Sequence, residues 1–286
     1  MIPYGKQNIS DDDIEAVIAV LKSDFVTQGP VLPQFERAVA DHVGAAQCVA
    51  VNSATSALHI ALLSLDVGPG DLVWTSPITF VASSNAALYC GADVDFVDIC
   101  PNSFNMDMDV LADKLKQAET DGRLPKVIVP VHLTGRSCDM KALDALRKTY
   151  GFKVVEDASH AIGADYLEHK VGSCAYSDLC VFSFPPVKII TTGEGGAVTT
   201  NDRTLSRKLA TLRSHGITRD PDEMGRNDGP WYYEQRSLGF NYRMTDIQAA
   251  LGLSQMTRLT NFVTRRRELA KRYDRLLADS DFKRPL

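Results

Sequence analysis

The feature that most constrains the fold of this chain is a regular alternation of short apolar runs with longer stretches of helical spacing. Runs rich in β-branched residues lie at residues 48–51, 72–76, 94–98, 127–132, 153–157, 179–184 and 197–200. Amphipathic stretches lie between most of them, at residues 54–65, 81–89, 139–150 and 203–215. Nearly continuous apolar strands that alternate with helices are typical of a sheet covered on both faces. We therefore predict an α/β fold with a mostly parallel, seven-stranded sheet flanked by helices.

Two segments interrupt this alternation. Residues 216–241 form a long connection rich in Gly, Pro and aromatic residues. A connection of this length inside a compact domain usually has a function. Residues 245–277 then carry apolar positions at helical spacing, with Thr245 as a candidate N-cap. We predict one long helix over this range.

The charge balance and the cysteines exclude several classes of protein. With 31 Lys and Arg against 36 Asp and Glu, the net charge is −5, so no basic field is present to attract nucleic acid. No run approaches the ~18 apolar residues that a membrane span requires, and the N-terminus has no signal core. The six cysteines include no CxxC pair, which argues against zinc or a disulfide framework. We expect a cytoplasmic protein with no metal, nucleic-acid or membrane partner.

The residues just after each predicted strand are the candidates for a site, because ligands bind at the carboxyl ends of strands in such sheets. Ser183 ends one strand, and Lys188 follows it before the glycine cluster of residues 193–196. This order suits a lysine amine that the chain holds in a fixed position and that a ligand can approach closely. It is not a phosphate-binding P-loop, since the glycines follow the lysine. Most lysines are solvated surface residues, so Lys188 alone is a moderate signal.

Other strand ends carry a carboxylate, hydroxyls and an aromatic ring. Asp157 ends the strand at residues 153–157, where burial makes its charge costly without a partner; the plain alternative is a helix cap. Ser53 and Thr55 stand at a predicted helix start, which is either an anion site or an ordinary N-cap. Phe80 follows a further strand, although a lone Phe usually belongs to the core. Together these groups match the needs of pyridoxal phosphate: an amine, a carboxylate for the pyridine nitrogen, and donors for the phosphate.

Motifs spread along most of the chain give the same indication, and they resemble those of the DegT/DnrJ/EryC1/StrS family of sugar aminotransferases: VNSATSALHIAL, TSPITFVAS, EDASHAIGA, TTGEGGAVTTND and GFNYRMTDIQAALGLSQ. The resemblance runs from Ile2 to about Leu277 and is strongest to the pseudaminic-acid branch. It implies the aspartate-aminotransferase (type I) fold and pyridoxal 5'-phosphate as cofactor. That branch converts a UDP-linked 4-keto-6-deoxy-N-acetylhexosamine into its 4-amino sugar, with L-glutamate as donor.

The resemblance also implies roles for individual residues. Lys188 matches the lysine that forms a Schiff base with the cofactor, and Asp157 matches the partner of the pyridine nitrogen. The other cofactor contacts that it implies are His160 beside the phenolic oxygen, Phe80 as the stacking ring, the phosphate-binding residues Ala54, Thr55 and Ser183, and Asn241 reaching in from the other subunit of a homodimer. The residues that match the lining of the sugar-nucleotide pocket are Tyr4, Asp24, Phe25, Val26 and Thr27.

The sequence departs from the family pattern in two places. Pro185 stands where relatives commonly have a histidine or another aromatic or polar residue. Relatives also continue beyond the long helix into a small domain that closes over the substrate, and we expect this domain to be largely missing. The expected organisation is an N-terminal arm and substrate-lining segment (1–30), a large cofactor-binding domain (31–244), and a long helix with the start of a truncated small domain (245–286).

Two other functions remain open at this point. The first is pyridoxal-dependent dehydration or deoxygenation of a sugar. In related enzymes of that class a histidine replaces the Schiff-base lysine, so Lys188 favours transamination. The second is a truncated, non-catalytic dimer that binds the cofactor, for which Pro185 and the missing C-terminal part are the only support.

Overall fold

A computed structural model describes residues 5–226 and 228–279 of the chain. Its centre is a seven-stranded sheet with the strand order β1-β9-β8-β5-β4-β2-β3. The strands are β1 (Gln47–Val51), β2 (Leu72–Thr75), β3 (Asp93–Phe96), β4 (Val127–Val129), β5 (Lys153–Asp157), β8 (Leu179–Ser183) and β9 (Gly196–Thr200). All seven predicted strands are thus confirmed, and the mostly parallel sheet is confirmed as well. Strand β9 is the exception, since it runs antiparallel to both of its neighbours, β1 and β8.

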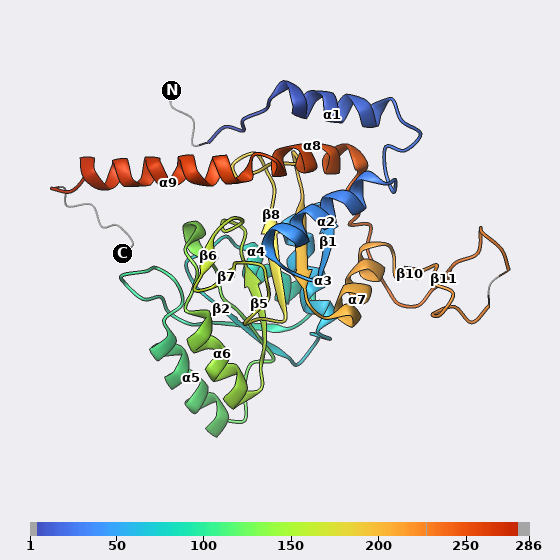
Figure 1. The fold of residues 1–286 in the computed structure, drawn as a ribbon. Coiled ribbons are helices and arrows are strands. Elements are labelled where there is room, and N and C mark those ends of the chain that lie inside the picture. Colours follow the sequence, from blue (N-terminus) through green and yellow to red (C-terminus); the bar gives the residue numbers. More distant parts are fainter. Residues whose placement is uncertain (1–4, 227, 280–286) are drawn as a thin grey trace.

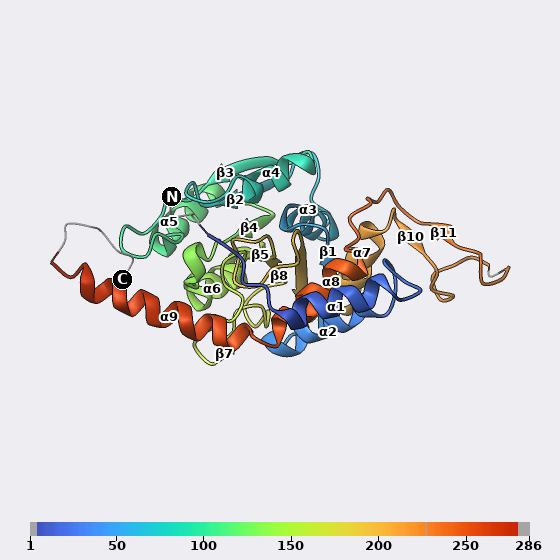
Figure 2. The same ribbon diagram turned by 90° about the horizontal axis from the view of Figure 1, so that it is seen from above.

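Helices cover both faces of this sheet (Figures 1 and 2). The helices are α1 (Asp11–Leu21), α2 (Val31–Val43), α3 (Ala54–Ser64), α4 (Ala82–Tyr89), α5 (Met108–Thr120), α6 (Met140–Tyr150), α7 (Arg203–Arg213), α8 (Asp246–Met256) and α9 (Leu259–Leu276), with a short 3-10 turn at Leu133–Gly135. Helices α3, α4 and α7 pack on one face. Helices α2 and α8 cover the other face over β1, β9 and β8, and α5 and α6 cover it over β2, β4 and β5.

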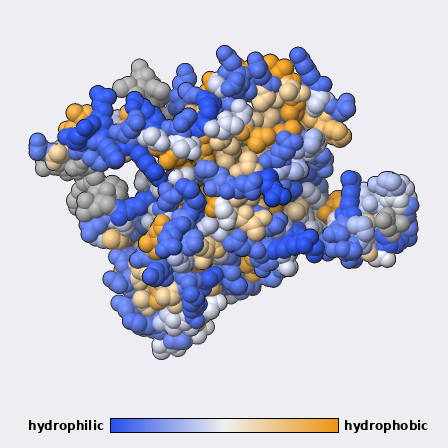
Figure 3. Space-filling view, viewed as in Figure 1, coloured by the Kyte–Doolittle hydropathy of each residue, from blue (hydrophilic) through white to orange (hydrophobic). Residues whose placement is uncertain are grey.

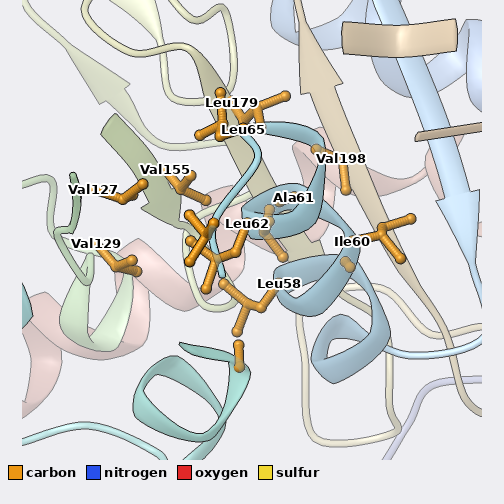
Figure 4. Packing of buried hydrophobic residues seen from close by; sticks show 14 of the residues in the cluster. Leu58, Ile60, Ala61, Leu62, Leu65, Val127, Val129, Val155, Leu179 and Val198 are labelled. Carbon is orange, nitrogen blue, oxygen red and sulfur yellow. The ribbon is translucent and has the colours of Figure 1, made fainter. Parts of the chain in front are cut away.

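Successive side chains of a strand contribute alternately to the hydrophobic cores on the two faces of the sheet. In β5, Val155 faces the α3 side while Val154 faces α5 and α6, because successive side chains of a strand point to opposite faces. Helix α3 is buried on nearly all sides, and Figure 4 shows Leu58 and Leu62 directed toward the strand residues Val129 and Val155. A helix this deeply buried holds its N-terminus in a fixed position at the edge of the sheet.

The predicted long helix over residues 245–277 is wrong in one respect, because the chain forms two helices there. Its start is as expected: Thr245 is the N-cap of α8, and its side chain accepts a hydrogen bond from the backbone N–H of Gln248. The helix ends at Met256, and α9 begins at Leu259. Arg258, between them, binds Asp13 of α1 and Asn8, so a contact with the N-terminal part of the chain sets the break.

Two small hairpins lie outside the main sheet. Strands β6 (Asp165–Tyr166) and β7 (His169–Lys170) form one, and β10 (Ile217–Thr218) and β11 (Glu234–Gln235) form the other. The second belongs to the long connection at residues 216–241, and both views show it projecting away from the body of the molecule (Figures 1 and 2). The six cysteines are free thiols, four of them buried. Among the described helices, none is long and apolar enough to cross a membrane.

Candidate active site

A cavity of about 400 Å³ opens where the carboxyl ends of the strands meet. Residues that follow β1, β2, β4, β5 and β8 all contribute to its lining. The structure brings seven of the predicted site residues together there: Ala54, Thr55, Phe80, Asp157, His160, Ser183 and Lys188. Residues that are up to 134 positions apart in the sequence therefore share one cavity, as the strand-end argument predicts.

One wall of the cavity is the start of α3. Ser53 caps this helix by accepting from the backbone N–H of Ser56 (3.1 Å), so the ordinary N-cap reading is right for Ser53. Within the described part of the chain, the N–H groups of Ala54 and Thr55 have no hydrogen-bond partner. The unpaired N–H groups and the positive end of the helix dipole make an anion site at this point.

Gly196 is necessary for this wall. A side-chain Cβ at Gly196 would lie 2.6 Å from the backbone nitrogen of Ala54 and 2.6 Å from the carbonyl carbon of Ser53. Because both are backbone atoms, a larger residue could enter only by displacing the helix start. We call the N–H groups of Ala54 and Thr55, with Gly196 beside them, the phosphate cradle.

Asp157 lines the cavity and is only 4% exposed. Its Oδ2 accepts from the hydroxyl of Ser83 (2.7 Å), and its Oδ1 accepts from the hydroxyl (2.6 Å) and the backbone N–H (3.1 Å) of Ser159. Three donors therefore stabilise the charged carboxylate in a buried position and fix its orientation. The hydrogen bond from the Ser159 N–H is also the kind of bond that a helix cap makes, which is the alternative role that we considered for Asp157.

Lys188 reaches the cavity from a tightly bonded loop between β8 and β9. Its backbone N–H donates to the carbonyl of Pro185 (3.0 Å), and Thr192 N–H donates to the carbonyl of Phe184 (2.9 Å). Burial lowers the pKa of the Lys188 ammonium from its usual 10.5, and the negative charge of Asp157 opposes this shift. Burial thus favours the neutral, nucleophilic amine. Pro185 lines the cavity beside Lys188 and leaves no hydrogen-bonding side chain there.

His160 also lines the cavity, as a neutral ring. Its Nδ1 accepts from the backbone N–H of Thr134 (3.2 Å), so the neutral ring carries its proton on Nε2. Burial lowers the pKa of His160, and the nearby positive charge of Lys188 lowers it further, while Asp157 opposes both. The backbone of His160 is closely packed: a Cβ at Gly135, which has φ +93°, would lie 2.7 Å from the carbonyl oxygen of His160. The ring is therefore available as a hydrogen-bond donor.

Not every predicted site residue lines this cavity. Asn241 is exposed, and its backbone carbonyl accepts from Nδ2 of Asn52 (3.5 Å). Asp24 and Phe25 line a separate apolar groove of about 520 Å³ between α1, α2 and α8, and Val26 and Thr27 are exposed next to them. Tyr4 lies outside the described residues.

Two residues that hydrogen-bond Asp157 were not predicted as site residues from the sequence. Ser159 follows Asp157 by two positions, and an Asp with a Ser two residues later is a local hydrogen-bonding pattern that the sequence does display. Ser83 is 74 positions from Asp157 and sits in α4. No local pattern identifies it, because only the packing of α4 against the sheet brings the two side chains together.

The size and the groups of the cavity fit pyridoxal phosphate. The phosphate cradle offers two unpaired N–H groups, and the hydroxyls of Thr55 and Ser183 line the same cavity. A buried carboxylate and a half-buried amine line the same cavity, and these are the groups that would pair with the pyridine nitrogen and form an imine with the aldehyde of the cofactor. Phe80 also lines the cavity, although its ring is 71% exposed in the single chain.

Comparisons with known proteins agree with this geometry. The model of the DegT/DnrJ/EryC1/StrS aminotransferase family matches residues 7–286. The spore coat polysaccharide biosynthesis protein SpsC of Bacillus subtilis is 42% identical over 95% of this chain and 68% of its own length. A UDP-4-amino-4,6-dideoxy-N-acetyl-beta-L-altrosamine transaminase of Campylobacter jejuni is 41% identical over 96% of this chain and 69% of its own.

Solved structures match over nearly the whole chain. Helicobacter pylori PseC, an aminotransferase involved in the biosynthesis of pseudoaminic acid, superposes with a TM-score of 0.88 at 34% identity, covering 98% of this chain and 71% of that one. The PLP form of a putative sugar aminotransferase from Streptococcus pneumoniae superposes with a TM-score of 0.84 at 31% identity, covering 97% and 71%. The chain therefore belongs to the DegT/DnrJ/EryC1/StrS aminotransferase family and is a pyridoxal-phosphate-dependent sugar aminotransferase.

Proposed function

We propose that this chain transfers the amino group of L-glutamate to a UDP-linked 4-keto-6-deoxy-N-acetylhexosamine, giving the 4-amino sugar for nonulosonate (pseudaminic-acid) biosynthesis. The observation that carries the proposal is the pairing of Lys188 with Asp157 in one cavity beside the phosphate cradle. Retention of the lysine favours transamination over dehydration.

Each group in the cavity has a distinct task. The phosphate cradle and the hydroxyls of Thr55 and Ser183 would bind the cofactor's phosphate, and Asp157 would keep the pyridine nitrogen protonated. When bound, pyridoxal phosphate supplies an electron sink for the bonds at the amino-bearing carbon. The Lys188 amine, whose pKa burial lowers, would accept the proton from the amino-bearing carbon of the donor and deliver it to the cofactor carbon that carried the aldehyde. The Nε2–H of His160 would donate to the phenolic oxygen and hold the ring in place.

The sugar substrate is inferred from the relatives and from the residues that follow α1. Two altrosamine transaminases of Campylobacter jejuni are 40% and 41% identical to this chain, and a GDP-perosamine synthase of Caulobacter vibrioides is 42% identical. The nucleotide and the sugar are therefore the points to test. We propose that Tyr4, Asp24, Phe25, Val26 and Thr27 line the sugar-nucleotide pocket.

A homodimer with shared sites accounts for the placement of Asn241. Its side chain is exposed, although it belongs to the segment that the resemblance assigns to the cofactor. Phe240 and Tyr242 on either side stack on one another (4.9 Å), and Tyr242 hydrogen-bonds His59 of α3 (3.1 Å). The backbone around Asn241 is thus fixed while its amide faces outward. The β10–β11 hairpin next to it projects from the body (Figure 2), and Leu238 is 81% exposed there. We propose that this face meets the second copy in the cytoplasm.

The experiment is product analysis with labelled donor. The chain, loaded with pyridoxal phosphate, is incubated with the UDP-keto-sugar and L-glutamate whose amino nitrogen carries a heavy isotope. Mass spectrometry should find the label in a UDP-amino-sugar. A GDP-linked keto-sugar in a parallel reaction tests the nucleotide, and Lys188→Ala serves as the inactive control.

The other outcomes discriminate among the alternatives. A deoxygenated sugar without the label would show dehydration. Cofactor binding with no change in its visible band on adding glutamate, and no product, would identify a non-catalytic binding protein. Faster turnover of the GDP-sugar would overturn the assignment of the nucleotide.

A further inference from the structure

A buried aspartate outside the cavity connects α8 to the exposed segment between α1 and α2. Asp246 is the first residue of α8 and is 0% exposed. Its Oδ1 accepts from the backbone N–H of Gly29 and its Oδ2 from that of Val31, both at 3.1 Å. Its own backbone N–H donates to the carbonyl of Val26 (3.1 Å). One residue thus makes three hydrogen bonds to the backbone of residues 26–31.

The segment that Asp246 holds is otherwise open to solvent. Every residue from Leu21 to Gln28 is exposed, including the hydrophobic side chains of Phe25 (53%) and Val26 (45%). Figure 3 shows hydrophobic surface over this region, near α1. The backbone is also under strain, since Gln28 has φ +54°, a conformation that residues with a Cβ seldom adopt. A strained, fixed backbone that presents exposed side chains is a common feature of binding segments.

The close approach depends on Gly29. A Cβ there would lie 2.5 Å from Oδ2 of Asp246 and 2.5 Å from Cβ of Phe25. The glycine therefore permits the carboxylate and the backbone to meet. Burying a carboxylate is costly unless donors compensate it, and here the donors come from this segment and not from a basic side chain.

The same helix start also contacts the loop beside the cofactor cavity. Gln248, three residues into α8, donates from Nε2 to the carbonyl of Glu194 (2.9 Å), and Glu194 lines the cavity. The first turn of α8 therefore sets the position of residues 26–31 relative to the loop that carries Lys188.

We propose that Asp246 is a positioning residue for the sugar nucleotide: it fixes residues 24–31 in the shape that binds the substrate, without touching the cofactor. This inference rests on the proposed function, because it takes residues 24–27 as part of the sugar-nucleotide pocket. It predicts that loss of the Asp246 carboxylate weakens sugar-nucleotide binding and leaves the reaction with glutamate intact.

The test compares two variants with the parent. Asp246→Asn keeps the size of the side chain but leaves one of its two backbone donors facing an NH₂ group. Gly29→Ala keeps the carboxylate but drives a methyl group into it. Both should increase hydrogen exchange at the amides of residues 26–31 and raise the KM for the sugar nucleotide about tenfold. The rate at which glutamate changes the cofactor's visible band should stay at the parent value.

Asp107→Asn is the matched control. Asp107 also accepts from two backbone N–H groups at a helix start, those of Asp109 and Val110 in α5, which do not line the cavity. It should lower thermal stability without changing either the exchange at residues 26–31 or the KM.

Different results would refute the positioning role of Asp246 and the proposed function of the chain. Unchanged exchange at residues 26–31 in Asp246→Asn overturns the positioning role, whether or not the chain turns over any sugar. If the glutamate reaction of Asp246→Asn falls by the same factor as its sugar-nucleotide binding, the positioning role is overturned too, because the residue would then act on the whole fold. A parent chain that shows neither glutamate reaction nor sugar-nucleotide binding refutes the proposed function instead.

Discussion

Replacing Gly196 by alanine tests the phosphate cradle directly. The added Cβ would lie 2.6 Å from the nitrogen of Ala54, whereas ordinary contact begins at 3.4 Å. The strand or the helix start must therefore yield by roughly 0.8 Å, if it moves along the line of contact. Both contacted atoms belong to the backbone, so no side-chain rotation relieves the overlap.

The displacement acts on the groups that would bind the phosphate. A hydrogen bond of about 2.9 Å that lengthens by this amount leaves the bonding range. Each hydrogen bond to a charged group contributes about 1.5–3 kcal/mol, and the N–H groups of Ala54 and Thr55 would both be affected. Their combined loss of about 3–6 kcal/mol corresponds to an affinity roughly 10²- to 10⁴-fold lower for pyridoxal phosphate.

Titration of the apoprotein with pyridoxal phosphate, followed by its visible absorption, measures this affinity. Gly68→Ala is the control, because a Cβ at Gly68 meets nothing within 4 Å. Thermal unfolding without cofactor separates a loss of fold from a loss of binding. Parent-like affinity in a folded Gly196→Ala protein would show that the cradle does not bind the phosphate as described.

Three further predictions address the other groups of the site. Asp157→Asn should retain the fold and the bound cofactor but slow the single-turnover reaction with glutamate by at least about a hundredfold; a rate close to the parent's would make the carboxylate structural. Because burial lowers the pKa of Lys188, the neutral amine persists at lower pH, so the rate at which the apoprotein develops the visible band should rise with pH with a midpoint below pH 10.5. A midpoint at or above that pH would contradict the lowered pKa. Mixing Lys188→Ala chains with Asn241→Ala chains should restore part of the activity if the sites are shared between subunits, and confirmed heterodimers without activity would speak against sharing.

The sheet and most of the cavity follow from local patterns in the sequence. Buried strands are apolar along their whole length, and the residues after them converge because parallel strands end at the same edge. This is why Asp157, Ser183 and the start of α3 could be placed from the sequence alone. The same reasoning gives no distances, and it does not identify Ser83, whose hydroxyl meets Asp157 only through the packing of α4.

The break between α8 and α9 shows where local patterns fail. Apolar residues continue at helical spacing across it, so periodicity predicts one helix. Arg258 instead binds Asp13 (2.5 Å) and Asn8 (2.8 Å), which lie about 250 positions earlier in the chain. Asp13 is fully buried, and burying its charge requires these partners. A contact between the two ends of the described chain thus overrides the helical preference of the residues themselves.

The antiparallel strand β9 has a consequence for how the protein assembles. Gly196 pairs with Ser183 on one side and with Val51, 145 positions earlier in the chain, on the other. The cradle is complete only when β9 has entered between β1 and β8. Contacts of such long sequence separation form slowly, since chain entropy is lost before they contribute. Pyridoxal phosphate should therefore bind only after β9 has paired with β1 and β8. In a refolding experiment, its visible band should appear only after the helices have formed.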